Sequence, residues 1–192
     1  VQAKLNLILG MNLDIEYIMP AHGIIWKDYI ADIIETYKDI ATQKAANKAV
    51  IVYESVWKHT QQIAESLAEG FSDADMDVKV YQLSDTKSSI VMREIMDAKV
   101  VCIGSGTYNN VMAPSVAAFL EHIRPCKFKN KKGLAFAAYG WFNQVAKEID
   151  TRMQQSGIES CHDVINQCYT PSDDQLEDYY NIAHEIAKNC QE

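Results

Sequence analysis

The fold class is decided by the stretch Ala49-Val50-Ile51-Val52-Tyr53-Glu54-Ser55-Val56-Trp57-Lys58-His59-Thr60. Its first five residues are apolar without interruption, which is typical of a parallel strand covered on both faces. The residues that follow, up to Phe71, place Ile63 and Leu67 at helical spacing with Phe71. The sequence therefore predicts a buried strand, a short polar loop and a helix that packs back onto the strand.

The same alternation of strand and helix continues towards the C-terminus. Further strands are predicted at Val78–Tyr81, Val100–Gly104, Gly133–Ala137 and near Asp163–Gln167. Further helices are predicted at Ser115–Ile123, around Val145, Ile149 and Met153, and from Ser172, where Gln175 completes a capping box. Five strands separated by helices predict an α/β fold, a doubly wound parallel sheet with helices on both faces.

The first 48 residues are organised differently from the rest. We expect the end of a helix at Lys4–Leu9, a strand at Ile15–Met19, a turn at Pro20–Gly23, a helix at Tyr29–Ala41 and a linker at Gln43–Lys48. Because the first residue is Val1 rather than Met, we also expect the sequence to be a piece of a longer protein.

Composition excludes several classes of protein. The 192 residues include 26 acidic and 18 basic side chains, and the net charge of -8 argues against a nucleic-acid binder. No apolar run approaches the roughly 18–20 residues that cross a bilayer. The five cysteines form no CxxC pair, which favours reduced thiols in a cytoplasmic protein, and Cys102 is predicted to be buried. Four lysines, Lys127, Lys129, Lys131 and Lys132, are interpreted as a solvated basic turn before the fourth strand, the alternative being a docking surface for an acidic electron carrier.

Ligands of doubly wound sheets lie beyond the carboxyl ends of the strands, so the loops after strands one, three and four are the candidate site. The first loop, Glu54–Thr60, opens a helix, whose backbone N–H groups and dipole attract an anion. Ser55 and Thr60 add hydroxyl donors for a phosphate. The alternative is that Thr60 only caps the helix and that Trp57 is an exposed aromatic residue.

The second and third loops supply different chemistry. The second, Ser105–Asn110, offers asparagine amides and the ring of Tyr108, and it lacks the third glycine of a dinucleotide fingerprint. Taken alone it could equally be a polar turn. The third, Ala138–Asn143, places three aromatic residues at the end of a strand, although a dimer contact or a plug for the sheet end would also explain them. Together the three loops match the anion, the polar edge and the flat ring of FMN.

The loops resemble those of the flavodoxin domain of flavodiiron proteins, which carry Ser-x-Trp-x-x-Thr, Ser-Pro-Thr-x-Asn-Asn and Ser-Tyr-Gly-Trp. Here they stand as Ser55-Val-Trp57-Lys-His-Thr60, Ser105-Gly-Thr107-Tyr108-Asn109-Asn110 and Ala138-Tyr139-Gly140-Trp141. The resemblance implies a flavodoxin-like five-stranded sheet of order 2-1-3-4-5 in residues 48–192. It also implies FMN contacts from Ser55, Val56, Trp57, Lys58, His59, Thr60, Ser105, Thr107, Tyr108, Asn109, Asn110, Ala138, Tyr139, Gly140, Trp141, Phe142 and Asn143. Lys58 and His59 stand where the family usually has small residues, and Gly106 replaces its proline.

The N-terminal residues extend the resemblance. Ile18–Trp26 is similar to the end of the family's metallo-β-lactamase-like domain, whose final histidine is a di-iron ligand, so residues 1–47 are expected to be the tail of that domain plus a linker. In this chain His22 could bind iron only together with upstream ligands that the sequence lacks. We therefore expect no catalytic residue here, and a di-iron centre only in the full-length parent.

The resemblance implies that the chain is the electron-transfer part of an oxygen or nitric oxide reductase. Its donor would be rubredoxin or a flavin reductase, and the parent would form a head-to-tail homodimer without nucleic-acid or membrane partners. The alternative is a flavodoxin-like domain that has lost FMN and serves as a binding or assembly module. A receiver-type signalling domain is set aside because Gly104-Ser105 stands where a phospho-accepting aspartate would be needed, and a hydrolase of the metallo-β-lactamase type because the metal cluster is missing.

Overall fold

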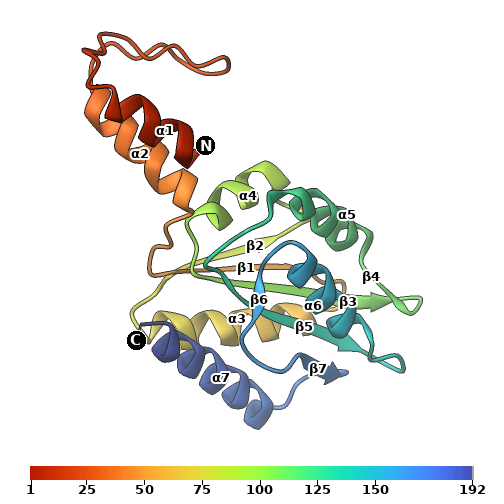
Figure 1. Cartoon of the computed structure of the whole chain (residues 1–192). Coiled ribbons are helices and arrows are strands. Elements are labelled where there is room, and N and C mark those ends of the chain that lie inside the picture. The colour runs from red at the N-terminus through yellow and green to blue at the C-terminus, as the bar shows by residue number, and fades with distance from the viewer. Residues whose placement is uncertain (192) are drawn as a thin grey trace. The chain divides into compact units, whose positions relative to one another are not determined.

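The structure, a computed structural model, describes residues 1–191 and divides the chain into two compact units, Val1–Lys44 and Ala45–Glu192 (Figure 1). The first unit contains helices α1 (Gln2–Gly10) and α2 (Ile30–Thr42), in agreement with the two helices predicted there. The predicted strand Ile15–Met19 is wrong. Only Ile18 pairs, through an isolated antiparallel bridge to Trp26, and a single bridged pair without neighbouring strands does not make a sheet.

The second unit is the predicted α/β fold. Its strands are β1 (Lys48–Glu54), β2 (Asp77–Gln82), β3 (Val100–Tyr108), β4 (Val111–Met112), β5 (Lys132–Tyr139), β6 (Glu159–Ser160) and β7 (Ile165–Cys168). Its helices are α3 (His59–Ser72), α4 (Ser88–Met96), α5 (Pro114–Ile123), η1 (Arg124–Cys126), α6 (Val145–Gln155) and α7 (Asp173–Gln191). The parallel strands are ordered β2-β1-β3-β5-β6, with β7 also paired to β5, which confirms the predicted order.

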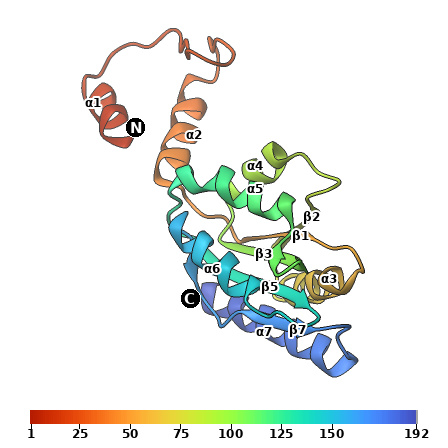
Figure 2. The ribbon, with the colours of Figure 1, turned by 90° about the vertical axis from the view of Figure 1, so that its right-hand side faces the viewer.

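The sheet is covered on both faces, as its uninterrupted apolar strands require (Figures 1 and 2). Alternate residues of β1 enter opposite cores: Val50 and Val52 pack with α4, α5 and α6, whereas Ala49 and Ile51 pack with α3 and α7. Cys102 is fully buried, as predicted. This two-sided packing fixes the strand ends, and with them the loops that leave the sheet.

The main differences from the prediction lie in α4, in the hairpin after β3 and in the fifth strand. Helix α4 was not predicted, and β3 continues to Tyr108 because it forms a hairpin with β4. The fifth strand is split into β6 and β7, which pair with successive parts of β5. The capping box of α7 is confirmed, since Ser172 N donates to Gln175 Oε1 at 3.0 Å and Gln175 N donates to Ser172 Oγ at 3.3 Å.

The interpretation of the four-lysine turn as solvated is wrong for Lys131. Its side chain is buried, and its ammonium group donates to the carbonyl oxygens of Met96 and Ala98 at 2.9 Å each. These carbonyls lie at the end of α4 and just beyond it, where helices leave backbone acceptors without intrahelical partners. Burial lowers the pKa of Lys131 from 10.5 to about 8. Lys131 is thus a structural connection between the start of β5 and the end of α4.

The lowered pKa predicts a pH-dependent contribution of Lys131 to stability. Between pH 8 and 10.5 the unfolded chain keeps a proton on Lys131 that the folded chain has lost, so stability relative to Lys131→Met rises with pH. We expect a gain of about 1–3 kcal/mol over this range, measured by urea unfolding. Lys132→Met is the matched control, because Lys132 is half-exposed and paired with Glu159. Parallel pH profiles for wild type and Lys131→Met would contradict the prediction.

Candidate functional site

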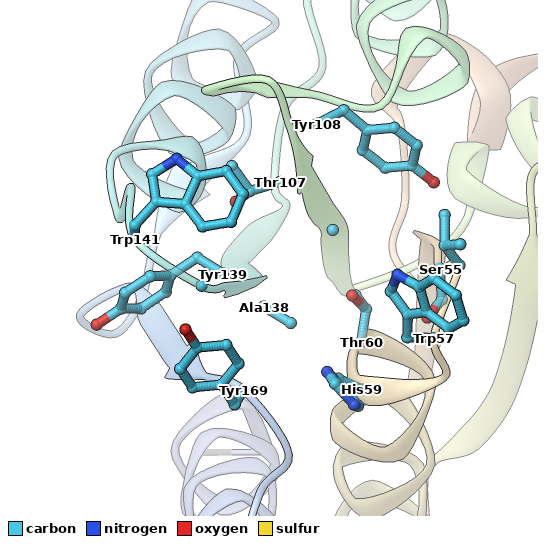
Figure 3. A pocket seen from close by; sticks show the side chains of 13 residues that line it. Ser55, Trp57, His59, Thr60, Thr107, Tyr108, Ala138, Tyr139, Trp141 and Tyr169 are labelled. Atoms are coloured by element: carbon cyan, nitrogen blue, oxygen red, sulfur yellow. The ribbon is translucent and has the colours of Figure 1, made fainter.

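A pocket of about 440 Å³ lies beyond the carboxyl ends of β1, β3 and β5, where the order of strands reverses (Figure 3). The three predicted loops converge on it. Of the predicted residues, those that line it are Ser55, Val56, Trp57, His59, Thr60, Thr107, Tyr108, Ala138, Tyr139, Gly140 and Trp141. Those that do not line it are Lys58, Ser105, Asn109, Asn110, Phe142 and Asn143.

The first loop presents the start of α3 to the pocket. Lys58, in the left-handed conformation at φ +67°, occupies the N-cap position, and no side chain caps the helix. Thr60 is therefore the second residue of the helix and not its cap. Its buried side chain lies beside the pocket together with Ser55 (Figure 3). Two hydroxyl groups and the free N–H groups of a helix start are suited to hold a phosphate.

A buried carboxylate fixes the base of this loop. Glu54 Oε1 accepts hydrogen bonds from the Ser55 backbone N–H and from Gln82 Nε2, both at 3.1 Å, and its Oε2 accepts one from Ser115 Oγ at 3.0 Å. These bonds join the ends of β1 and β2 to the first turn of α5. Burial, together with the charge of Glu54, raises the pKa of Tyr108.

The second loop divides into a structural part and a pocket part. Ser105 is fully buried, donates to the Gly106 carbonyl at 2.6 Å and accepts from the Ala113 N–H at 2.8 Å, which holds the start of α5 against β3. Thr107 and Tyr108 line the pocket. The two asparagines, with φ of +46° and +66°, form the exposed tip of the β3–β4 hairpin, where a left-handed backbone is required at both positions.

The third loop gives the pocket an aromatic wall. Tyr139 and Trp141 lie across the pocket from Trp57 of the first loop (Figure 3). Trp57 and Trp141 are 80% and 83% exposed, far more than is usual for tryptophan, so both have surface available to a ligand. Phe142 instead packs against the hydrophobic core, and Asn143 is exposed and accepts a hydrogen bond from Gln144.

Two lining residues were not predicted. Gly106 lies between the side chains of Tyr108 and Thr60. A Cβ on Gly106 would be 3.5 Å from the Tyr108 ring and 3.7 Å from Thr60 Oγ1. Tyr169 follows β7, and its backbone N–H donates to the Tyr139 carbonyl at 2.8 Å. The sequence signal for Tyr169 is its position directly after the fifth strand. That strand is parallel to the others, so it ends at the same edge of the sheet as the pocket.

The polar and apolar groups of the pocket fit FMN. Among the described residues, Thr107 Oγ1 is a buried side-chain atom without a hydrogen-bond partner, which is uncommon unless a ligand or water satisfies it. Aromatic walls with a few convergent polar groups are typical of cofactor pockets. The helix start with its hydroxyls suits the phosphate, and the exposed rings suit a flat heterocycle.

The described residues contain neither a metal-binding cluster nor a membrane-spanning helix. In residues 1–191, no group of three or more His, Cys, Asp or Glu side chains could hold a metal ion. His22 is exposed in the first unit. None of the helices described is both long and apolar enough to span a membrane. All five cysteines are free thiols, and burial raises the pKa of Cys102 well above its usual value.

Comparison with known proteins identifies the second unit. The flavodoxin family matches residues 51–182. The chain belongs to the flavodoxin family. Its relatives include a nitric oxide reductase of Moorella thermoacetica, 35% identical over 97% of this chain and 47% of that protein. They also include an anaerobic nitric oxide reductase flavorubredoxin of Pectobacterium carotovorum, 35% identical over 83% of this chain and 32% of that protein.

Among solved structures, the flavodoxin-family chain is similar to the rubredoxin oxygen:oxidoreductase of Desulfovibrio gigas. The TM-score is 0.93 and the identity 31%, over 98% of this chain and 48% of that chain. The resemblance to flavodiiron proteins predicted from the three loops is thereby confirmed, and so is the flavodoxin-like fold. The chain spans about a third to a half of the length of these relatives.

Proposed function

We propose that the second unit binds one FMN in the pocket and transfers electrons through it. The observation that carries this proposal is the convergence of the three loops on one pocket at the strand-order reversal. A match to the flavodoxin family over residues 51–182 supports it. When bound, the flavin supplies one-electron redox chemistry, and the chain binds, orients and shields it.

The groups that line the pocket would each contact a different part of FMN. The start of α3, with Ser55 and Thr60, holds the phosphate through N–H and O–H donors. Thr107 donates its otherwise unpartnered hydroxyl to the cofactor. Trp57 and Trp141 cover the ring and keep water from it. The two exposed asparagines remain candidates for contact with the ring edge from the hairpin tip.

For the longer protein we propose the arrangement implied by its relatives. Residues 1–47 would be the tail of a metallo-β-lactamase-like domain plus a linker, and His22 would join upstream ligands at a di-iron centre. That centre would reduce oxygen or nitric oxide with electrons relayed from rubredoxin or a flavin reductase. The names of the D. gigas and P. carotovorum proteins support a rubredoxin-type donor. A head-to-tail homodimer and a cytoplasmic location complete this proposal.

Titration of the flavin-free chain with FMN and with riboflavin tests the proposed function. We expect FMN to bind at least tenfold more tightly, because only FMN carries the phosphate that the start of α3 would hold with charge-assisted hydrogen bonds. Isothermal calorimetry gives both affinities and the stoichiometry. Equal affinity for the two flavins would contradict the phosphate assignment, and no binding of either would favour a binding or assembly module.

A further inference from the structure

A fourth loop, between β7 and α7, borders the same pocket. Its residue Thr170 places Oγ1 3.1 Å from Nε2 of His59, a hydrogen bond that joins residues 111 positions apart in the sequence. His59 is the first residue of α3 and lines the pocket. The loop that precedes α7 is thus connected directly to the loop that would hold the phosphate.

Tyr169, the residue before Thr170, shows that the fourth loop is fixed against the other walls of the pocket and does not merely lie near them. Tyr169 lines the pocket and has φ +57°, a left-handed conformation that is rare for a bulky aromatic residue. Its N–H donates to Tyr139, and its ring lies 3.4 Å from where a Cβ on Gly140 would be. Figure 3 shows Tyr169 and His59 on opposite sides of the lower pocket. The fourth loop therefore connects the third loop to the first.

We propose that Thr170 is a positioning residue that orients His59 to donate a hydrogen bond to the phosphate of a phosphorylated flavin. This inference rests on the proposed binding of FMN. The bond to Thr170 engages Nε2 of His59, so the proposal assigns the donor role towards the phosphate to the other ring nitrogen, Nδ1. His59 precedes Thr60 in α3 and lines the same pocket as Thr60 and Ser55, the other groups assigned to the phosphate.

The chemistry of imidazole explains why the orientation matters. A neutral imidazole has one donor and one acceptor nitrogen, and the partner of one nitrogen selects the state of the other. When the Thr170 hydroxyl donates to Nε2, the hydrogen is on Nδ1, which can then donate to an anion. Without Thr170 the ring can rotate or take the opposite tautomer, in which Nδ1 would present a lone pair to the phosphate.

The proposal predicts that four substitutions separate phosphate recognition from general effects on the pocket. His59→Ala is expected to weaken FMN binding about tenfold, as for the loss of one charge-assisted hydrogen bond. Thr170→Val is expected to weaken it three- to fivefold, whereas Thr170→Ser keeps the hydroxyl and restores wild-type affinity. Ser172→Ala removes the cap of α7 without touching the His59–Thr170 bond and is the matched control. Riboflavin, which lacks the phosphate, should bind all variants equally well.

The double variant His59→Ala/Thr170→Val gives the sharpest readout, because a residue that acts only through His59 has no effect once His59 is gone. We expect the double variant to bind FMN as weakly as His59→Ala alone. Additive losses, or equal losses for FMN and riboflavin, would overturn the role of Thr170 while leaving FMN binding by the wild type intact. If the wild-type protein binds FMN and riboflavin equally well, the phosphate assignment and this inference both fail, whereas no binding of either flavin would overturn the proposed function itself.

Discussion

Gly70→Ala is expected to destabilise the second unit by about 3 kcal/mol or more. A Cβ at Gly70 would lie 2.2 Å from the backbone oxygen of Tyr180 and 2.9 Å from Cβ of Ala183, so α3 and α7 could no longer pack at their present separation. Backbone atoms within a helix cannot move aside as a side-chain end can, so the cost should reach or exceed the upper range for overpacked cores. Urea unfolding measures the loss.

The matched control is Gly106→Ala in the same unit. Its Cβ would meet neighbours only at 3.5 and 3.7 Å, which are ordinary contact distances, so we expect a change within about 1 kcal/mol. Because His59 begins α3 and Thr170 precedes α7, displaced helices should also weaken FMN binding in Gly70→Ala. A stability loss below 1 kcal/mol for Gly70→Ala would show that the two helices are not in close backbone contact.

Thr60→Val is expected to weaken FMN binding by about 1–3 kcal/mol, the range for a hydrogen bond to a charged group. Valine keeps the shape of the buried threonine and removes only the hydroxyl. Because Thr60 is not the N-cap, the free energy of unfolding of the flavin-free protein should change by less than the roughly 1 kcal/mol that a lost cap costs. Calorimetric titration with FMN and urea unfolding measure the two effects.

Two controls accompany this prediction, the variant Thr60→Ser and titration with riboflavin. Thr60→Ser retains the hydroxyl and should bind FMN like the wild type, while riboflavin affinity should be the same for all three proteins. A large loss of stability with unchanged FMN affinity would contradict the assignment, since it would give Thr60 a structural role only.

Hydrophobic pattern was sufficient to predict most of the fold. The apolar run at residues 49–53 fixed β1 as a strand with two covered faces, and the order of the remaining strands followed from the family resemblance. The predicted strand at Ile15–Met19 was wrong because β-propensity cannot form a sheet without a partner strand. Lys131 was misjudged because sequence does not show which carbonyl oxygens of a distant helix will need a donor.

The candidate site was predicted at the level of loops and less well at the level of side chains. Ser55 and Thr60 line the pocket, but Ser105, included because it begins the second motif of the resemblance, uses its hydroxyl to accept a hydrogen bond from the Ala113 N–H. Nothing in the spacing of the second loop distinguishes a serine that faces a ligand from one that faces α5. Tyr169 was not predicted because a ligand was expected only at the loops after strands one, three and four, although β7 ends at the same edge of the sheet.

The flavin content of the purified chain shows directly whether the pocket holds FMN. The protein is to be purified, supplied with excess FMN, freed of unbound flavin by gel filtration and then denatured, so that the released flavin can be identified and counted. We predict the visible spectrum of oxidised flavin and one FMN per chain, released on denaturation. A colourless protein that retains no flavin after this treatment would show that the pocket does not bind FMN.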